Sequence, residues 1–142
     1  MNKHVDITTL GKNLWCTKCD LPISLRDVRH DNKYGVASIL TVECLRCNIL
    51  HKVPTFQAEE NSPISFPVNL NIALGMIDHG LGETHINGLF AAANFQTISP
   101  AFLKKTERRV GKAIEKVAKE SCLESIRLEK KETLANIQKE SM

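Results

Sequence analysis

Two pairs of cysteines constrain the fold of this chain more than any other feature of its sequence. Each pair has the spacing C-x-x-C, in the runs WCTKC and VECLRC, and 24 residues separate the two pairs. Two such pairs can place four sulfur atoms around one zinc ion, with S–Zn bonds of about 2.3 Å. Four thiolates leave no open position for a reacting water, so the predicted ion is structural. The predicted ligands are Cys16, Cys19, Cys44 and Cys47.

Disulfide bonds and a redox-active pair are the alternatives for these cysteines. Structural disulfides form in oxidising compartments, and residues 1–15 lack the apolar core of a secretory signal peptide. A thioredoxin-like motif belongs to a βαβ unit, and neither pair opens a helical pattern. Asp20 and Asn48 directly follow the two pairs, and both residue types tolerate the left-handed backbone of a tight turn. The sequence therefore favours the metal site over both alternatives.

A small β module is expected around the cysteine pairs, over residues 14–54. Short β-prone runs lie at residues 23–29, 36–43 and 49–53, and residues 31–35 have the composition of a hairpin loop. Three short strands cannot bury a sufficient core, so a metal ion would be needed to hold them together. The expected structure of this module is a zinc ribbon.

Helical periodicity replaces the strand pattern in the second half of the chain. Residues 55–67 are polar and proline-rich without periodicity, which predicts a linker. Apolar residues then recur at helical spacing from Val68 to Gly80, and from an N-cap at Thr84 to about residue 93. Ser99-Pro100 is a strong start signal for a third helix that runs past residue 120.

These elements predict an α+β fold. A zinc-ribbon-like β module at residues 14–54 is followed by the linker at 55–67 and by a helical module at 68–142. The short second helix, a turn at residues 94–98 and the long C-terminal helix have the outline of a helix-turn-helix. The odd cysteine, Cys122, is expected to be a buried structural thiol on that long helix.

The positive charge of the chain is concentrated in one segment. The formal net charge is only +3, but residues 104–119 hold seven Lys or Arg against two Glu. At 100° per residue, all seven basic residues fall on the side of a helix opposite the stripe of Leu103, Val110 and Val117. A merely solvated face usually mixes signs, so the pattern predicts contact with DNA phosphates. The predicted contacts are Lys104, Lys105, Arg108, Arg109, Lys112 and Lys116.

Four blocks of the sequence, in this order, resemble the N-terminal region of Mutator-like transposase domain proteins. They are LWCTKC, VECLRC followed by HKVPT, VNLNIALGMIDHGLG, and FLKKTERRVGKAIEKVAKES, and they cover about residues 14–125. The resemblance implies a transposable-element origin, zinc and DNA binding, and a nuclear location. It also implies that a catalytic domain with an RNase-H-like fold and a metal-binding carboxylate triad follows this region in the family.

No catalysis is expected from the residues of this chain. Two-metal phosphodiester chemistry needs converging carboxylates on a sheet scaffold, and residues after Ser121 show no strand pattern. Asp78, Glu83 and Glu107 are isolated carboxylates, for which surface or capping roles are expected. The chain is expected to be a truncated or remnant transposase without the catalytic domain, and no small-molecule substrate is expected.

A protein-interaction or oligomerisation module is the alternative function. Leu103, Val110 and Val117 keep a heptad on the long helix, which could self-associate, but Glu124 and Lys131 then occupy the same position. Salt separates the two hypotheses, because phosphate contacts weaken steeply with added salt and apolar pairing does not. No run of the sequence approaches 18 apolar residues, so no membrane partner is expected.

Overall fold

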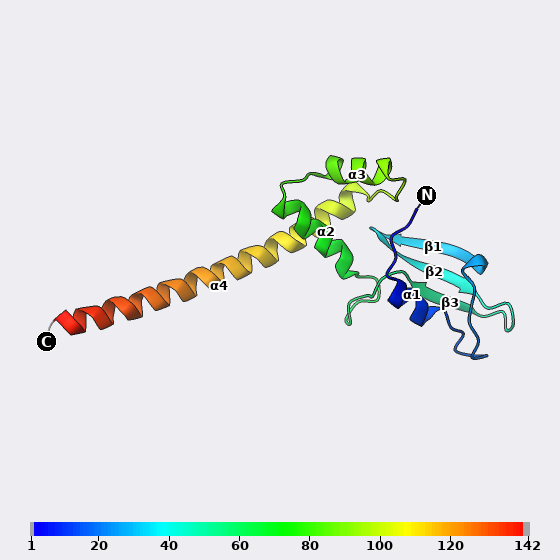
Figure 1. The fold of residues 1–142 in the computed structure, drawn as a ribbon, viewed down its shortest axis with the longest axis horizontal. Helices are drawn as coiled ribbons and strands as arrows, with labels where there is room; N and C mark the ends of the chain where they lie inside the picture. The colour runs from blue at the N-terminus through cyan, green and yellow to red at the C-terminus, as the bar shows by residue number, and fades with distance from the viewer. Residues whose placement is uncertain (1, 141–142) are drawn as a thin grey trace. The chain divides into compact units, whose positions relative to one another are not determined.

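The computed structural model describes residues 2–140, and its fold is α+β, as the sequence predicts (Figure 1). One three-stranded antiparallel sheet and four α-helices make up the described residues, together with a short 3-10 helix at Leu25–Asp27. The chain divides into two compact units, residues 1–107 and residues 108–142. The sheet and the first three helices belong to the first unit.

The sheet has the strand order β1-β2-β3, with β1 at Val28–Tyr34, β2 at Ala37–Glu43 and β3 at Leu50–Pro54. The predicted first strand and hairpin loop are wrong, because β1 runs through the residues assigned to the loop and turns at Gly35 and Val36. The interior of β1 is exposed. An exposed edge strand carries polar residues, so it is held by its hydrogen bonds to β2 and shows little apolar alternation in the sequence.

A short helix that the sequence interpretation missed, α1 at Ile7–Asn13, contacts β3. Asp6 caps it, because its carboxylate accepts a hydrogen bond of 3.0 Å from the Thr8 N–H. Asp6 followed by two threonines is an N-cap signal, but seven residues are too few for a visible apolar period.

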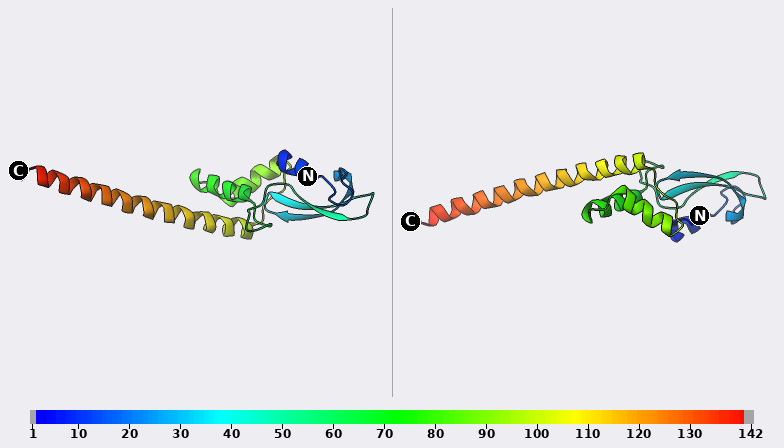
Figure 2. Two further views of the ribbon diagram at one scale, coloured as in Figure 1. Left: turned by 90° about the horizontal axis from the view of Figure 1, so that it is seen from below. Right: turned by 90° about the horizontal axis from the view of Figure 1, so that it is seen from above.

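The three predicted helices are present as α2 (Pro67–Asp78), α3 (Glu83–Ala92) and α4 (Pro100–Glu140). The start of α4 is confirmed, since the Phe102 N–H donates to the Ser99 hydroxyl at 3.3 Å. The predicted N-cap of α3 is wrong: Gly82 holds that position in place of Thr84. Figure 2 shows α4 as one uninterrupted helix.

The connection between α3 and α4 spans residues 93–99, which is longer than the three to four residues typical of a helix-turn-helix. The Asn87 side chain fastens this connection with two hydrogen bonds of 2.9 Å, accepting from the Ile98 N–H and donating to the Ile98 carbonyl. Helices α3 and α4 therefore share with a helix-turn-helix only the order of a short helix, a connection and a second helix.

Two apolar clusters lie within residues 1–107. The first, here called the ribbon cluster, surrounds the cysteines and is formed by Cys16, Ile23, Leu40, Val42, Cys44 and Val53. The second, here called the helical cluster, is formed by Val36, Met76, Ile98 and Leu103, with Phe90 and Phe102 packed against it. Val36 comes from the sheet, so the β1–β2 turn takes part in the packing of the helices.

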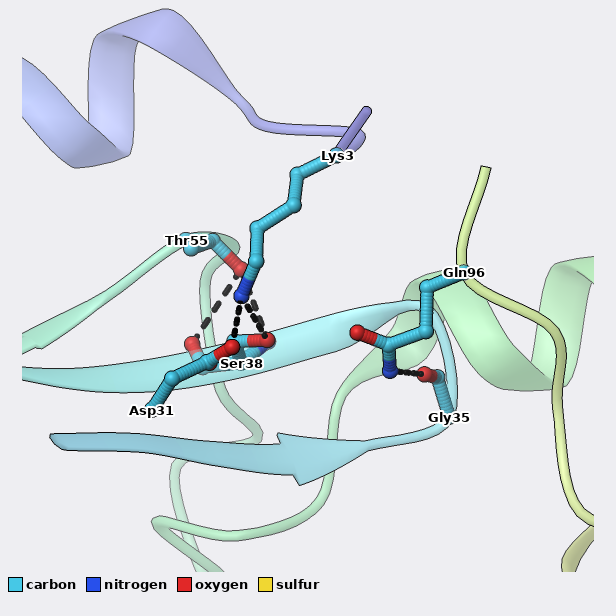
Figure 3. A network of polar contacts seen from close by, with 6 residues as sticks. All are labelled: Lys3, Asp31, Gly35, Ser38, Thr55 and Gln96. Carbon is cyan, nitrogen blue, oxygen red and sulfur yellow. Dashed lines mark hydrogen bonds and ion pairs between the residues drawn. The ribbon is translucent and has the colours of Figure 1, made fainter. Parts of the chain in front are cut away.

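The β1–β2 turn is held by side chains from α2, from α4 and from the connection before α4. Asn69 accepts from the Val36 N–H at 3.0 Å and donates to the Tyr34 carbonyl at 2.8 Å. Gln96 donates to the Gly35 carbonyl at 2.9 Å (Figure 3). Gly35 has a φ of +68°, and an added Cβ would lie 2.3 Å from Asn69 Oδ1 and 2.7 Å from a ring carbon of Phe102. Only glycine fits this close approach.

A second polar network ties the N-terminal segment to the sheet. Lys3 forms an ion pair with Asp31 and donates to the Ser38 hydroxyl at 3.2 Å, as Figure 3 shows. Thr55 and Ser38 exchange two hydrogen bonds, of 2.8 and 3.1 Å. The segments before and after residues 55–67 are therefore joined by hydrogen bonds at the β1–β2 turn. The predicted boundaries of the β module at residue 54 and of the helical module at residue 68 remain predictions.

Candidate metal centre

The two C-x-x-C segments form matching turns. The Asp20 N–H donates to the Cys16 carbonyl at 3.0 Å, and the Asn48 N–H donates to the Cys44 carbonyl at 2.8 Å. Asp20 has a φ of 52° and Asn48 a φ of 53°, the left-handed conformation expected from the sequence. Each turn therefore directs two sulfur atoms to one side, and the same local geometry is used twice.

The four predicted cysteines lie together. Their sulfur atoms are all within 4.8 Å of one another, and the Sγ–Sγ distances are 3.5 Å for Cys16–Cys47 and 3.6 Å for Cys19–Cys44. A tetrahedral ion with S–metal bonds of about 2.3 Å requires sulfur atoms about 3.8 Å apart. The cluster therefore has the donor set and the size to bind one metal ion.

The electrostatics of the cluster divide the cysteines into two kinds. The Cys19 N–H, donating to the Cys16 sulfur, lowers the pKa of the Cys16 thiol to about 6. In the second turn the Cys47 N–H lowers the pKa of Cys44 in the same way. Burial raises the pKa of Cys19 to about 12, and burial also raises the pKa of Cys47.

The cluster needs a cation before all four cysteines can ionise. Each turn stabilises one thiolate by its own backbone N–H groups, and the second sulfur of that turn then meets a negative neighbour in a site sheltered from water. A divalent ion removes this repulsion and takes all four sulfurs as thiolates. These pKa directions agree with a cluster that binds a cation through its sulfur atoms.

No histidine joins the cluster among the residues that the structure describes. His30 is exposed on β1, whereas His51 on β3 is partly buried and its Nε2 atom has no hydrogen-bond partner among the described residues. Pairing with Val42 puts His51 on the sheet face that carries the core.

The predicted DNA-contacting residues all lie on α4 and are exposed. Lys116 pairs with Glu120 across one turn at 3.9 Å. Exposed pairs of this kind contribute little to stability, so they do not fix the side chains against a ligand. DNA contact by Lys104, Lys105, Arg108, Arg109, Lys112 and Lys116 remains a prediction.

Other candidate residues do not form a site. Cys122 is exposed, so its predicted burial is wrong. Helical periodicity places Cys122 at the edge of the stripe formed by Leu103, Val110 and Val117. Among the described residues, the neighbours of Cys122 on α4 are exposed as well. The carboxylates Asp78, Glu83 and Glu107 lie on α2, α3 and α4, one on each helix.

No helix among residues 2–140 is long and apolar enough to cross a membrane. A family model described as "Mutator-like transposase" matches residues 2–142. No curated protein and no solved structure matches the chain significantly.

Proposed function

This chain belongs to the Mutator-like transposase family, and from that premise we propose that it is a zinc-stabilised DNA-binding region that works in the nucleus. In this proposal Zn²⁺ is held by the four clustered cysteines and stabilises the ribbon cluster. DNA is bound by the basic side of α4. The proposed role is binding rather than cleavage, and the candidate carboxylates Asp78, Glu83 and Glu107 lie on three different helices.

Zinc is the metal that this donor set favours. Four thiolates in a tetrahedral arrangement suit Zn²⁺ or an iron–sulfur centre, whereas harder ions such as Mg²⁺ and Ca²⁺ select oxygen ligands. Cys16 and Cys44 are buried and close to the apolar residues of the ribbon cluster. An ion bound there would link the turn before the 3-10 helix to the turn after β2, so its binding energy would contribute directly to folding.

The exposed basic side of α4 is the single observation that carries the proposal of DNA binding. Residues 104–119 place seven positive side chains on one side of the helix, and only Glu115 interrupts them. The opposite side is different, since Leu103, Thr106 and Val110 are buried. The buried positions thus lie opposite the basic side, and a basic side of this kind suits a polyanion.

Phosphate contact is a better match to this surface than base reading. Lys and Arg on an exposed helix reach the DNA backbone without a fixed register. The seven-residue connection before α4 also departs from the tight turn that positions a recognition helix in the major groove. We therefore expect affinity that depends strongly on salt and weakly on sequence.

Fluorescence anisotropy with labelled duplex DNA tests the proposal. If four phosphates are neutralised, log K should fall with log[salt] at a slope of about −3.6, and each lost contact should make the slope shallower by about 0.9. The variant Arg108→Gln/Arg109→Gln should bind all duplexes more weakly and lose about 1.8 from the slope.

The matched control is Arg127→Gln/Lys131→Gln, which removes the same charge from exposed positions of the same helix outside residues 104–119. This control should bind DNA nearly as well as the parent chain. Equal binding by all three proteins, or binding that salt does not weaken, would overturn the proposal. Such a result would support the alternative of a protein-interaction module.

A further inference from the structure

The apolar residues of α4 change sides along the helix. Leu103 and Val110 are buried on one side, but beyond Lys119 four large apolar side chains lie about 180° away, on the side that carries the basic residues, and Leu128 alone of the large apolar side chains described there stays on the first side. These side chains are Leu123, Ile126, Leu134 and Ile137, and between 53% and 60% of each is exposed. This arrangement differs from the heptad expected from Leu103, Val110 and Val117, which meets Glu124 and Lys131.

We propose that residues 122–138 of α4 pair with the same segment of a second copy of this chain, as a short parallel coiled coil. Leu123 and Ile137 would occupy a positions and Ile126 a d position, which is the 3,4 spacing that such a seam requires. The same heptad puts Lys130 at the central a position and Thr133 at the following d position.

The register argues for a second copy in parallel orientation. In a parallel, in-register pair every core residue meets its own copy, so Leu123, Ile126 and Ile137 each form an apolar layer. In an antiparallel pair a positions face d positions, and the register that joins Ile126 to Ile137 leaves Leu123 without an apolar partner. The parallel pair thus has three apolar layers where the antiparallel pair has two.

Charge complementarity supports the same pairing. Residues 120–142 hold four Lys or Arg and five Asp or Glu, so two copies of this segment can approach without the repulsion that residues 104–119 would produce. Lys130 at an a position lies beside the g position of the partner helix, which is Glu129 of the second copy. The contact between Lys130 and Glu129 of the second copy would favour the parallel orientation and one register.

The proposed dimer is expected to be weak. The seam covers about two and a half heptads, fewer than the three to four usual for a coiled coil. One Lys at an a position lowers stability further in exchange for specificity. The inference does not rest on DNA binding, although a dimer would bring two basic segments to one duplex, as basic-zipper helices do.

Sedimentation equilibrium of the full chain without DNA tests the dimer. The parent chain should shift from monomer to dimer mass as its concentration rises. Ile126→Glu/Ile137→Glu should weaken the association by at least about a hundredfold, because four apolar side chains per dimer lose their burial. Leu128→Glu is the matched control, since Leu128 is 54% exposed on the opposite side of the same helix, and it should dimerise like the parent chain.

A cross-linking experiment tests the orientation. In a Cys122→Ser background, Ile126→Cys should form an intermolecular disulfide under mild oxidation, whereas Leu128→Cys should not. A monomer at every concentration, or equal loss of association in Ile126→Glu/Ile137→Glu and Leu128→Glu, would overturn the proposal. Cross-linking of Ile126→Cys to Ile137→Cys in mixed samples, without cross-linking of Ile126→Cys to itself, would overturn the parallel orientation. DNA binding can succeed or fail independently of each of these outcomes.

Discussion

Replacing Asn69 by Ala should destabilise residues 1–107 through the β1–β2 turn. Asn69 is 6% exposed and is the residue of α2 that bonds both to the Val36 N–H and to the Tyr34 carbonyl. Alanine removes both partners at once. The Val36 N–H is then left in the helical cluster, where water cannot replace the lost acceptor.

The size of the effect follows from these two groups. An unsatisfied buried backbone group costs about 1–3 kcal/mol, and the Tyr34 carbonyl is only partly buried, so its loss lies at the low end of that range. Alanine has a higher helix propensity than asparagine, which offsets about 0.5 kcal/mol. The expected loss in the free energy of unfolding is therefore about 1.5–3.5 kcal/mol, a large part of the stability of a domain of this size.

Urea unfolding followed by Trp15 fluorescence measures this loss at the far end of the sheet, because Trp15 is the single tryptophan of the chain and precedes Cys16. Asn71→Ala is the matched control: Asn71 lies on the same helix and is exposed, so its replacement should change stability by less than about 0.5 kcal/mol. If Asn69→Ala and Asn71→Ala unfold at the same urea concentration, the ribbon folds independently of the helices and the reasoning is refuted.

Three further predictions concern the turn and the metal centre. Gly35→Ala should destabilise by about 2 kcal/mol or more in the same assay, because the positive φ and the contact with Asn69 exclude a Cβ; a change below 0.5 kcal/mol would contradict this. Purified reduced protein should contain one Zn²⁺ per chain, lost in Cys19→Ser but retained in Cys122→Ser, as measured by metal analysis. Zinc affinity should rise with pH above the pKa of about 6 for Cys16, because binding must displace protons from Cys19 and Cys47, whose pKa values are raised by burial; competition with a chelator at several pH values would show a flat profile if the sulfurs were not the ligands.

The clustering of the four cysteines could be predicted from the sequence because the geometry of each pair is local. Two residues separate the cysteines of each pair, and the residue after each pair, Asp20 or Asn48, sets the turn by its own backbone preference. These constraints do not depend on the rest of the fold. Only the meeting of the two turns requires tertiary structure, and a hairpin between them is sufficient to bring it about.

The course of β1 and the contacts of the β1–β2 turn could not be predicted in the same way. The residues of β1 are polar because the strand lies at an edge, so composition alone assigns them to a loop. Asn69 looks like an ordinary polar residue near the start of a helix, and its role depends on two backbone groups more than 30 residues earlier. No local rule connects such positions.

The course of β2 explains why the metal centre and the helices should respond to each other. The strand begins next to Val36, in the helical cluster, and ends one residue before Cys44, in the ribbon cluster. Leu40 and Val42 lie between and pair across the sheet with Val53 and His51. A one-residue shift in the register of β2 would move every side chain of the strand to the opposite face. Loss of packing at one end of β2 should therefore destabilise the packing at its other end. A metal ion bound by the four cysteines would therefore also stabilise α2 and the start of α4, and the Asn69→Ala experiment tests whether residues 55–67 separate the two cores.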